Sequence, residues 1–173
     1  MDTIHGIPNV EHTPDKLATP TDLTPEAAKA ISEALNGLIA DAFALYVKTK
    51  NFHWHLAGPH FRDYHLLFDE QADQLLASID PLAERVRRIG GLTIRSVSHI
   101  VELQSIADNN EVYIPAEEMV QYLLADNAHI SRRQRAAMEL AAEHRDHPTS
   151  NLLQELLDQT EKRIWFLYEV SAA

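Results

Sequence analysis

The chain has 173 residues, 45% of them hydrophobic and 24% charged, which is the composition of a globular protein of about one domain. It has no cysteine, so disulfides and thiolate metal sites are excluded, and its formal net charge of −11 should repel polyanions. Only five glycines and 7% aromatic residues favour helices over sheets.

Residues 1–23 carry prolines scattered through polar sequence, and we expect a flexible tail there, followed by one domain over residues 24–173. The first residues have no basic segment followed by an apolar run, so a secretory signal is not expected. No stretch approaches the ~20 apolar residues that a membrane helix needs. We therefore expect a cytoplasmic protein without membrane contact.

Apolar residues at helical period predict four long helices and a short one near 97–103. The Thr24 hydroxyl can cap the first helix, while glycine and proline pairs mark the breaks after it. The long helices are expected over about 24–54, 60–89 and 115–144, and from a break at 147–150 to about 170. One long connection, between the second and third, predicts an all-α, ferritin-like four-helix bundle with a crossover. A bundle without chemistry is the alternative.

The second helix carries a polar stripe beside its apolar face. At ~100° per residue, one arc holds His65, Asp69, Asp80 and Glu84. The neighbouring arc should face the core, and it consists of Phe61, Phe68, Leu75, Ile79, Leu82 and Val86. Apolar residues also lie within the polar arc: Leu66, Leu76 and Ala83. This mixture predicts a second buried surface rather than a face in bulk solvent.

The spacing within the stripe predicts two incomplete metal sites. His65 and Asp69 are one turn apart, as are Asp80 and Glu84, but Asp69 and Asp80 are separated by eleven residues, or ~16 Å. No ion spans that distance, because metal–ligand bonds are ~2.0–2.5 Å long. The midpoint between His65 and Glu84 is the same as that between Asp69 and Asp80, near residues 74–75. Two antiparallel copies of this helix about a dyad there would complete two intersubunit sites.

His53, near the end of the first helix, could add an imidazole to the half-site of His65. Imidazoles and carboxylates without thiolates suit iron or manganese, with zinc able to compete. The alternative for each residue taken alone is a solvated surface or a capped position in the core.

At these residues the sequence resembles the Dps family, ferritin-like mini-ferritins named as DNA-binding proteins from starved cells. The resemblance rests on "HWHL" from His53, on the spacing to His65 and Asp69, and on "DPLAER" from Asp80. Helix order and length agree from about residue 24 to residue 170. His55 departs from the usual motif, which has Asn there, and its role is left open.

The resemblance implies a hollow dodecamer with ferroxidase centres at its dyads. It implies that His53, His65 and Asp69 of one subunit bind metal together with Asp80 and Glu84 of its partner. Glu84 is expected to anchor the first iron, Asp80 or Asp69 to bridge, and the two histidines to hold the second iron.

Other residues gain roles only through this resemblance. Trp54 matches the family tryptophan beside the centre, expected to donate electrons that quench oxidant, with simple packing as the alternative. Lys50 matches a lysine expected to assist through a water. Glu155 and Asp158, early on the fourth helix, are candidates for acidic entry pores, although a solvated helical face is an equal alternative.

The function implied is iron oxidation and storage, in which two Fe(II) per centre are oxidised, preferably by hydrogen peroxide, and ferric mineral fills the shell. Such a protein protects against oxidative damage. Ordinary ferritins instead place Glu-x-x-His pairs inside one bundle. That pattern is absent from this sequence. Asp126 and His129 form an Asp-x-x-His pair, which we interpret as surface residues.

Two rival functions are a structural nucleoid protein that coats DNA and an inert helical assembly bound together by zinc. DNA affinity comes largely from Lys and Arg. Residues 1–24 offer Lys16 alone against Asp2, Glu11, Asp15 and Asp22, and the last four residues carry no base. A shell of twelve chains would have a formal charge of −132 (12 × −11).

The strongest local basic cluster is Arg132, Arg133 and Arg135, with acidic residues flanking it on the same helix. His5 and His12 could become cationic in acid or form a tail metal site. We expect no appreciable DNA binding near neutral pH.

Overall fold

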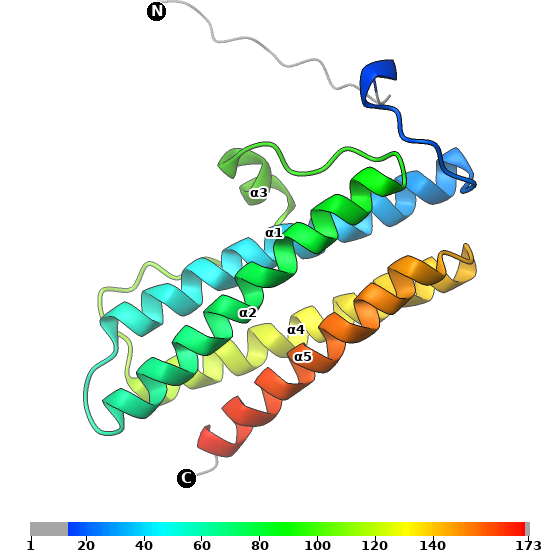
Figure 1. Cartoon of the computed structure of the whole chain (residues 1–173). Coiled ribbons are helices and arrows are strands. Elements are labelled where there is room, and N and C mark those ends of the chain that lie inside the picture. Colours follow the sequence, from blue (N-terminus) through cyan, green and yellow to red (C-terminus); the bar gives the residue numbers. More distant parts are fainter. Residues whose placement is uncertain (1–13, 172–173) are drawn as a thin grey trace, which may run out of the picture.

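The protein is all-helical over residues 14–171, the part of the chain that the computed structural model describes. Its four long helices form two hairpins, α1 (Pro25–His55) with α2 (Phe61–Arg88) and α4 (Ala116–Glu143) with α5 (His147–Ser171) (Figure 1). The crossover between α2 and α4 contains the short helix α3 (Val97–Leu103). The predicted all-α four-helix bundle with a short crossover helix is confirmed.

Local sequence signals set the helix ends. The Thr24 side chain caps α1 by accepting a hydrogen bond from the Ala27 N–H at 3.2 Å, as predicted. Gly58 has a φ of 102° in the turn to α2, a conformation that glycine adopts without steric cost. The last long helix starts at His147, at the beginning of the predicted break, where the Asp146 carboxylate accepts a 3.1 Å hydrogen bond from the Thr149 N–H.

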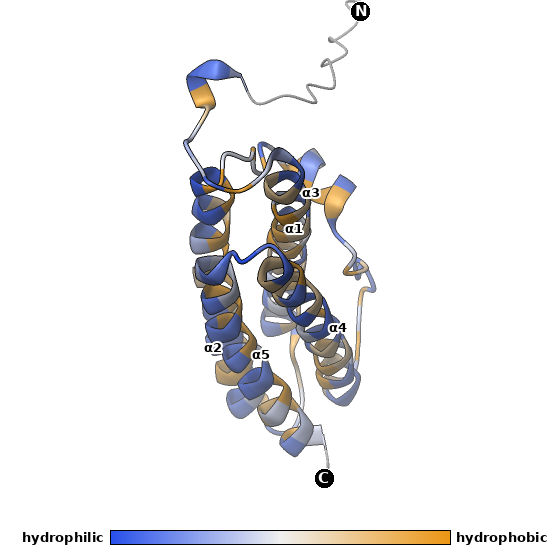
Figure 2. Ribbon diagram, turned by 90° about the vertical axis from the view of Figure 1, so that its right-hand side faces the viewer, coloured by the Kyte–Doolittle hydropathy of each residue, from blue (hydrophilic) through white to orange (hydrophobic). Residues whose placement is uncertain are grey.

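Buried apolar side chains form two clusters, one near each end of the bundle. The long helices each carry hydrophobic and hydrophilic positions along their length (Figure 2). One cluster includes Phe52 and Phe68, close to the α1–α2 turn, and the other includes Leu35 and Val86. The predicted core positions of α2 are buried except for Phe61, which is 45% exposed. Phe61 is the first residue of α2 and lies at the end of the bundle, where less of the fold covers it.

The crossover is tied to α1 by a buried carboxylate. Asp41 accepts hydrogen bonds from the N–H of Ser105 at 2.5 Å and of Ile106 at 3.1 Å, and it forms an ion pair with Arg133 of α4. Gly37 lies one turn earlier on α1, and a side chain there would collide with the Arg133 guanidinium. This network fixes where the chain leaves α3 and how α4 packs on α1.

The N-terminal prediction is tested only in part. Residues 15–17 form a 3-10 turn, and the Leu17 carbonyl accepts a 2.5 Å hydrogen bond from Arg87. Residues 1–13, which include His5 and His12, lie outside the described residues, so the flexible tail stays a prediction.

We expected no stretch long and apolar enough for a membrane helix, and α1 contradicts this when only its length and composition are considered. An 18-residue window of α1 reaches a mean hydropathy of 1.3. However, 61% of that window is buried inside the fold, since α1 supplies much of the bundle core. The apolar character of α1 is therefore explained by packing.

Candidate metal centre

Two histidines meet where α1 ends and α2 begins. The rings of His53 and His65 stack with their centroids 3.7 Å apart. His53 Nδ1 lies 2.8 Å from the His65 carbonyl, and His65 Nδ1 lies 3.1 Å from the His53 carbonyl. A carbonyl only accepts hydrogen bonds, so each Nδ1 must carry the proton and each Nε2 keeps its lone pair. Both imidazoles are thus prepared to bind a metal through Nε2.

Asp69 lies beside His53, on the α2 turn that follows His65. Its Oδ1 is 3.8 Å from His53 Nε2 and 2.6 Å from Lys50 Nζ. The hydrogen bond from Lys50 holds the pKa of the Asp69 carboxyl below its usual value, and the same bond raises the pKa of Lys50. The ammonium of Lys50 therefore contacts the carboxylate directly.

Two neighbours of His53 lie at the surface. Trp54 is 64% exposed, and Lys50 Nζ is 5.9 Å from the centroid of its ring. Such exposure leaves the indole open to solvent or to another chain. His55, which departs from the family motif, places Nδ1 2.8 Å from the Asn51 carbonyl and is also exposed.

The remaining predicted ligands occupy the far half of α2. Asp80 and Glu84 are exposed beside an open depression of about 380 Å³, whose lining includes Arg87, Arg88 and Thr93. Glu84 forms a 2.5 Å ion pair with Arg88, one turn along the helix. Within residues 14–171 of one chain, no three His, Asp or Glu side chains gather closely enough to hold a metal. The structure brings His53, His65 and Asp69 together and keeps Asp80 and Glu84 apart from them.

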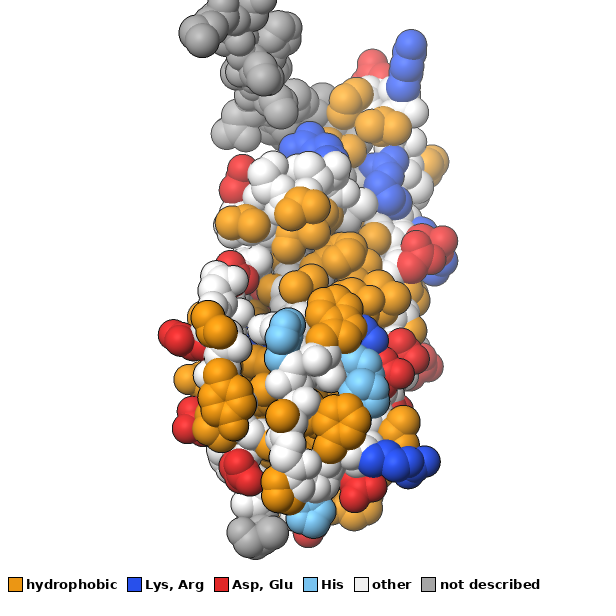
Figure 3. Space-filling view, turned by 90° about the vertical axis from the view of Figure 1, so that its left-hand side faces the viewer, with side chains coloured by type: hydrophobic (Ala, Val, Ile, Leu, Met, Phe, Trp, Pro, Cys, Tyr) orange, Lys and Arg blue, Asp and Glu red, His pale blue; other side chains and the backbone are white. Residues whose placement is uncertain are grey.

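Large apolar side chains are exposed beside the first group and between the two groups. Leu66 is 49% exposed and Leu76 is 46% exposed, and both belong to the arc of α2 that carries the acidic residues. The single chain leaves these leucines in water. Further apolar side chains and histidines lie on the face of the molecule that includes α3 and the α1–α2 turn (Figure 3).

The chain and its fold have clear relatives. A family model for the ferritin-like domain matches residues 32–172. The chain is 34% identical over 141 residues to DNA protection during starvation protein 2 of Bacillus anthracis, covering 80% of this chain and 94% of that protein. The chain belongs to the Dps family of ferritin-like proteins.

Solved structures agree with this Dps assignment. The crystal structure of antigen TpF1 from Treponema pallidum superposes with a TM-score of 0.85 and 29% identity, over 90% of this chain and all of that one. A Dps protein from Vibrio cholerae has a TM-score of 0.82 and 29% identity, over 88% and 96% of the two chains. The latter is described as a member of a broad superfamily of ferritin-like diiron-carboxylate proteins.

Our interpretation of Asp126 and His129 as surface residues of this Dps chain needs correction. Asp126 is not a free surface residue, because its carboxylate forms a 2.5 Å ion pair with the buried ammonium of Lys48. His129 is also partly buried, with Nε2 2.7 Å from the Ser105 hydroxyl. Both residues lie between α4 and the rest of the fold, a contact that helical periodicity alone does not reveal.

The basic cluster on α4 of this Dps chain is also divided by ion pairs. Arg133 pairs with the buried Asp41, and Arg135 pairs with Glu161 of α5. Two of the three arginines are therefore already neutralised by carboxylates within the chain, and the cluster does not form one basic patch.

Proposed function

We propose that this protein oxidises and stores iron at centres shared by two chains. Two copies of α2 pack antiparallel, so that His53, His65 and Asp69 of one chain face Asp80 and Glu84 of the partner subunit. The assembly is a hollow dodecamer, and its compartment is the cytoplasm. The observation that carries this proposal is the division of the predicted ligands into two partial groups, one at the start of α2 beside His53 of α1 and one in the far half of α2.

The exposed leucines support an interface at this place. Leu66 lies next to His65 and Leu76 lies between the two partial groups, and a second α2 would cover both. Burial of apolar area stabilises association by roughly 25 cal/mol per Å². An antiparallel dyad near residues 74–75 lays each of these leucines opposite the partner's α2 and joins the half-sites in the same step.

The donor set fits Fe(II) as a substrate. Two imidazoles and three carboxylates supply nitrogen and oxygen ligands, which suit iron and manganese and also admit zinc. The three carboxylates offset most of the charge of two Fe(II). Lys50 forms an ion pair with Asp69, and Arg88 forms one with Glu84. Both ion pairs must break before these carboxylates bind iron.

Two Fe(II) held side by side permit a balanced two-electron reaction. Each Fe(II) gives one electron, hydrogen peroxide takes both together with two protons, and two water molecules form. No hydroxyl radical is released, because the O–O bond is never cleaved by a single electron. Trp54, exposed beside the centre, supplies an electron to any stray oxidant. The ferric product passes to the mineral, and Glu155 and Asp158 line the route of entry.

The decisive experiment is an anaerobic titration of the iron-free assembly with Fe(II), followed by a pulse of hydrogen peroxide. We expect binding that saturates near two Fe(II) per chain and oxidation of two Fe(II) per peroxide, without trapped hydroxyl radical. Glu33→Gln, at an exposed position of α1, is the matched control. An assembly that binds zinc but oxidises no faster than free Fe(II) would instead be the inert zinc-bound alternative.

A DNA-coating function has less support. Several relatives are named DNA protection during starvation proteins, which describes those proteins. In this chain, Arg133 and Arg135 are paired with carboxylates, and the formal charge is −11. Protection through iron chemistry requires no contact with DNA.

A further inference from the structure

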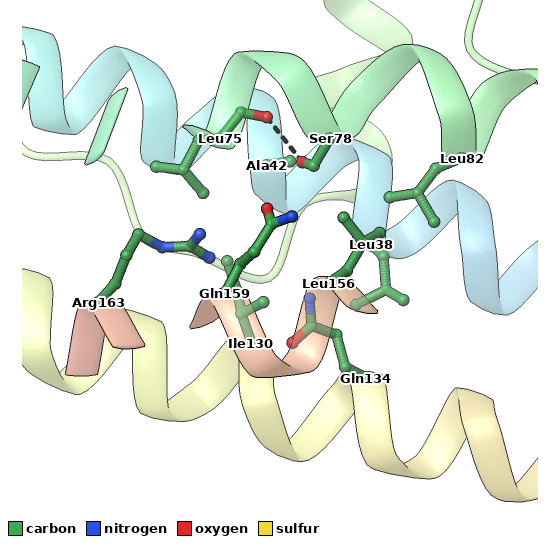
Figure 4. Close-up of a pocket in the computed structure, with 10 residues that line it drawn as sticks. All are labelled: Leu38, Ala42, Leu75, Ser78, Leu82, Ile130, Gln134, Leu156, Gln159 and Arg163. Atoms are coloured by element: carbon green, nitrogen blue, oxygen red, sulfur yellow. Dashed lines mark hydrogen bonds between the residues drawn. The ribbon is translucent and has the colours of Figure 1, made fainter. Parts of the chain in front are cut away.

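The interior of the bundle offers little room for a further ligand. Leu38, Leu75, Ile130 and Leu156, one from each long helix, line a small space there (Figure 4). Its volume of about 10 Å³ admits at most one water molecule, and none of the ten side chains labelled in Figure 4 is an imidazole or a carboxylate. The start of α2 is different, because an aromatic ring there stacks directly on a proposed iron ligand.

Rings four residues apart contact one another along the start of α2. His60, Tyr64 and Phe68 form one series, with successive centroids 6.2 and 6.1 Å apart, and Phe68 is buried in the core. Phe61 and His65 form a second series, with centroids 5.1 Å apart and ring planes inclined by 25°. Side chains at this spacing are neighbours on a helix surface. The first series therefore leads into the core, and the second leads to the proposed metal centre.

Phe61 contributes little to the core. It is the first residue of α2 and is 45% exposed, although its position in the helical period predicts burial. An apolar ring that stays this exposed gains only part of the stabilisation that full burial provides. Its stack on His65 therefore explains an aromatic residue at this position better than the core does.

Three contacts fix the imidazole of His65. Its Nδ1 is hydrogen-bonded to the His53 carbonyl at 3.1 Å, and its ring stacks on those of His53 and Phe61. The hydrogen bond holds one atom of the ring but lets the ring plane turn about that atom. The stacked neighbours restrain the plane, because stacking favours near-parallel rings. His53 is itself held by the fold, being only 8% exposed, whereas Phe61 stacks on His65 from the protein surface.

We propose that Phe61 is a positioning residue of the iron centre, an inference that rests on the proposed function. Its ring holds the His65 imidazole in the plane in which the free Nε2 lone pair has one direction. A metal bound at Nε2 makes the imidazole more positive, and the face of an aromatic ring attracts positive charge. The stack therefore favours the orientation of His65 that binds metal, before and after the metal arrives.

Co(II) is the probe, because it takes nitrogen and oxygen ligands as Fe(II) does and its visible absorption changes on ligation. Phe61→Leu keeps an apolar side chain but removes the ring. It should weaken Co(II) binding to the iron-free assembled protein by about threefold, since an aromatic pair adds modestly to burial and only correctly oriented His65 binds. Phe61→Tyr keeps the ring and should bind Co(II) like the wild type.

Tyr64→Leu is the matched control, because it removes a ring of the other series in the same turn of α2. It should lower the Tm but leave the Co(II) affinity unchanged. If Tyr64→Leu weakened Co(II) binding as much as Phe61→Leu, or if Phe61→Tyr failed to restore it, Phe61 would only stabilise the start of α2 and the proposal would be wrong.

A second measurement separates this inference from the proposed function. In crystals of the metal-free assembled protein, the His65 ring should have one orientation in the wild type and more than one in Phe61→Leu. If the wild type bound neither Co(II) nor Fe(II) while His65 lost its order in the variant, the proposed function would be wrong and the orientation of His65 by Phe61 would stand. A single, unchanged orientation of His65 in Phe61→Leu would overturn the proposal.

Discussion

Lys50 donates a hydrogen bond from Nζ to Oδ1 of Asp69 at 2.6 Å, which places an ammonium group beside a carboxylate that we propose as an iron ligand. The bond keeps Asp69 ionised and aimed toward His53. The Lys50 ammonium and Fe(II) therefore compete for the Asp69 carboxylate.

Replacing Lys50 by Met should tighten anaerobic Fe(II) binding by about thirtyfold. A doubly charged Fe(II) and an ammonium 4 Å apart repel by about 2 kcal/mol in water, and the variant removes that repulsion. Lys50→Arg keeps the charge and should bind Fe(II) like the wild type. Isothermal titration of the assembled protein measures the effect, and weaker binding by Lys50→Met would show that the ammonium assists iron entry.

The Asp69→Ala and Glu84→Ala variants should each abolish rapid iron oxidation when assembled alone, because each change damages every shared centre. In a dimer of one variant with the other, both changes fall in one centre and the second centre is intact. Equimolar mixing should therefore restore about a quarter of the wild-type rate, since half of the dimers are mixed. Verified mixed shells without any recovery would exclude centres shared across the dyad.

Fe(II) affinity should fall as the pH drops from 7.5 to 5.5. Metal binding needs neutral imidazoles, and histidine has an ordinary pKa of ~6.5. Asp69 does not cause this loss, because its lowered pKa keeps the carboxylate ionised throughout that range. Its pairing with Lys50 is present above the ordinary Asp pKa of ~3.9 and is lost only below the lowered value. Anaerobic titrations at several pH values measure the profile, and a flat one would argue against ligation by His53 and His65.

Asp41→Asn should destabilise the fold by about 3 kcal/mol, which corresponds to a drop in Tm of roughly 6–12 °C. The variant leaves Arg133 without its carboxylate and weakens the hydrogen bonds to Ser105 and Ile106. Thermal denaturation at equal protomer concentration measures the change. Glu33→Gln breaks only an exposed 4.0 Å pair with Lys29 and should shift Tm by less than about 2 °C. An equal effect of the two variants would show that the crossover is not held by Asp41.

The iron-free assembly should not shift duplex DNA at pH 7.5 and 50–150 mM salt. Binding to DNA requires free cationic side chains, and Arg133 and Arg135 are already paired with carboxylates. Gel-shift titration without divalent metal provides the measurement. Micromolar or tighter retention of DNA would mean that residues 1–13, which include His5 and His12, or another surface supply the cations.

Much of the fold follows from local signals along the chain. Apolar periodicity defined the four long helices, and the Thr24 cap and the turn at Gly58 marked ends that the structure reproduces within about a residue. These features are predictable because capping and helical phase depend on neighbouring residues only. The partition of the proposed ligands on α2 is equally local, since the rise per residue sets the separation of Asp69 and Asp80.

The contacts between helices could not be obtained this way. A lone arginine or aspartate on an amphipathic helix has the same local pattern whether it faces water or a neighbouring helix. Arg163, Asp41 and Asp126 are polar residues whose partners lie on other elements, so helical phase does not identify them. Phe61 shows the opposite case. Its position in the helical period predicts burial, but it is exposed because it lies at the end of the bundle.

The sequence by itself therefore determined the helices, the crossover and the spacing of the half-sites on α2, because backbone geometry and periodicity are properties of short segments. Only the tertiary structure decided which charges are buried, which tautomer His53 and His65 adopt, and that Lys50 holds Asp69. These depend on how closely α1, α2, α4 and α5 approach one another, and that distance is set by the packing of side chains from all four helices.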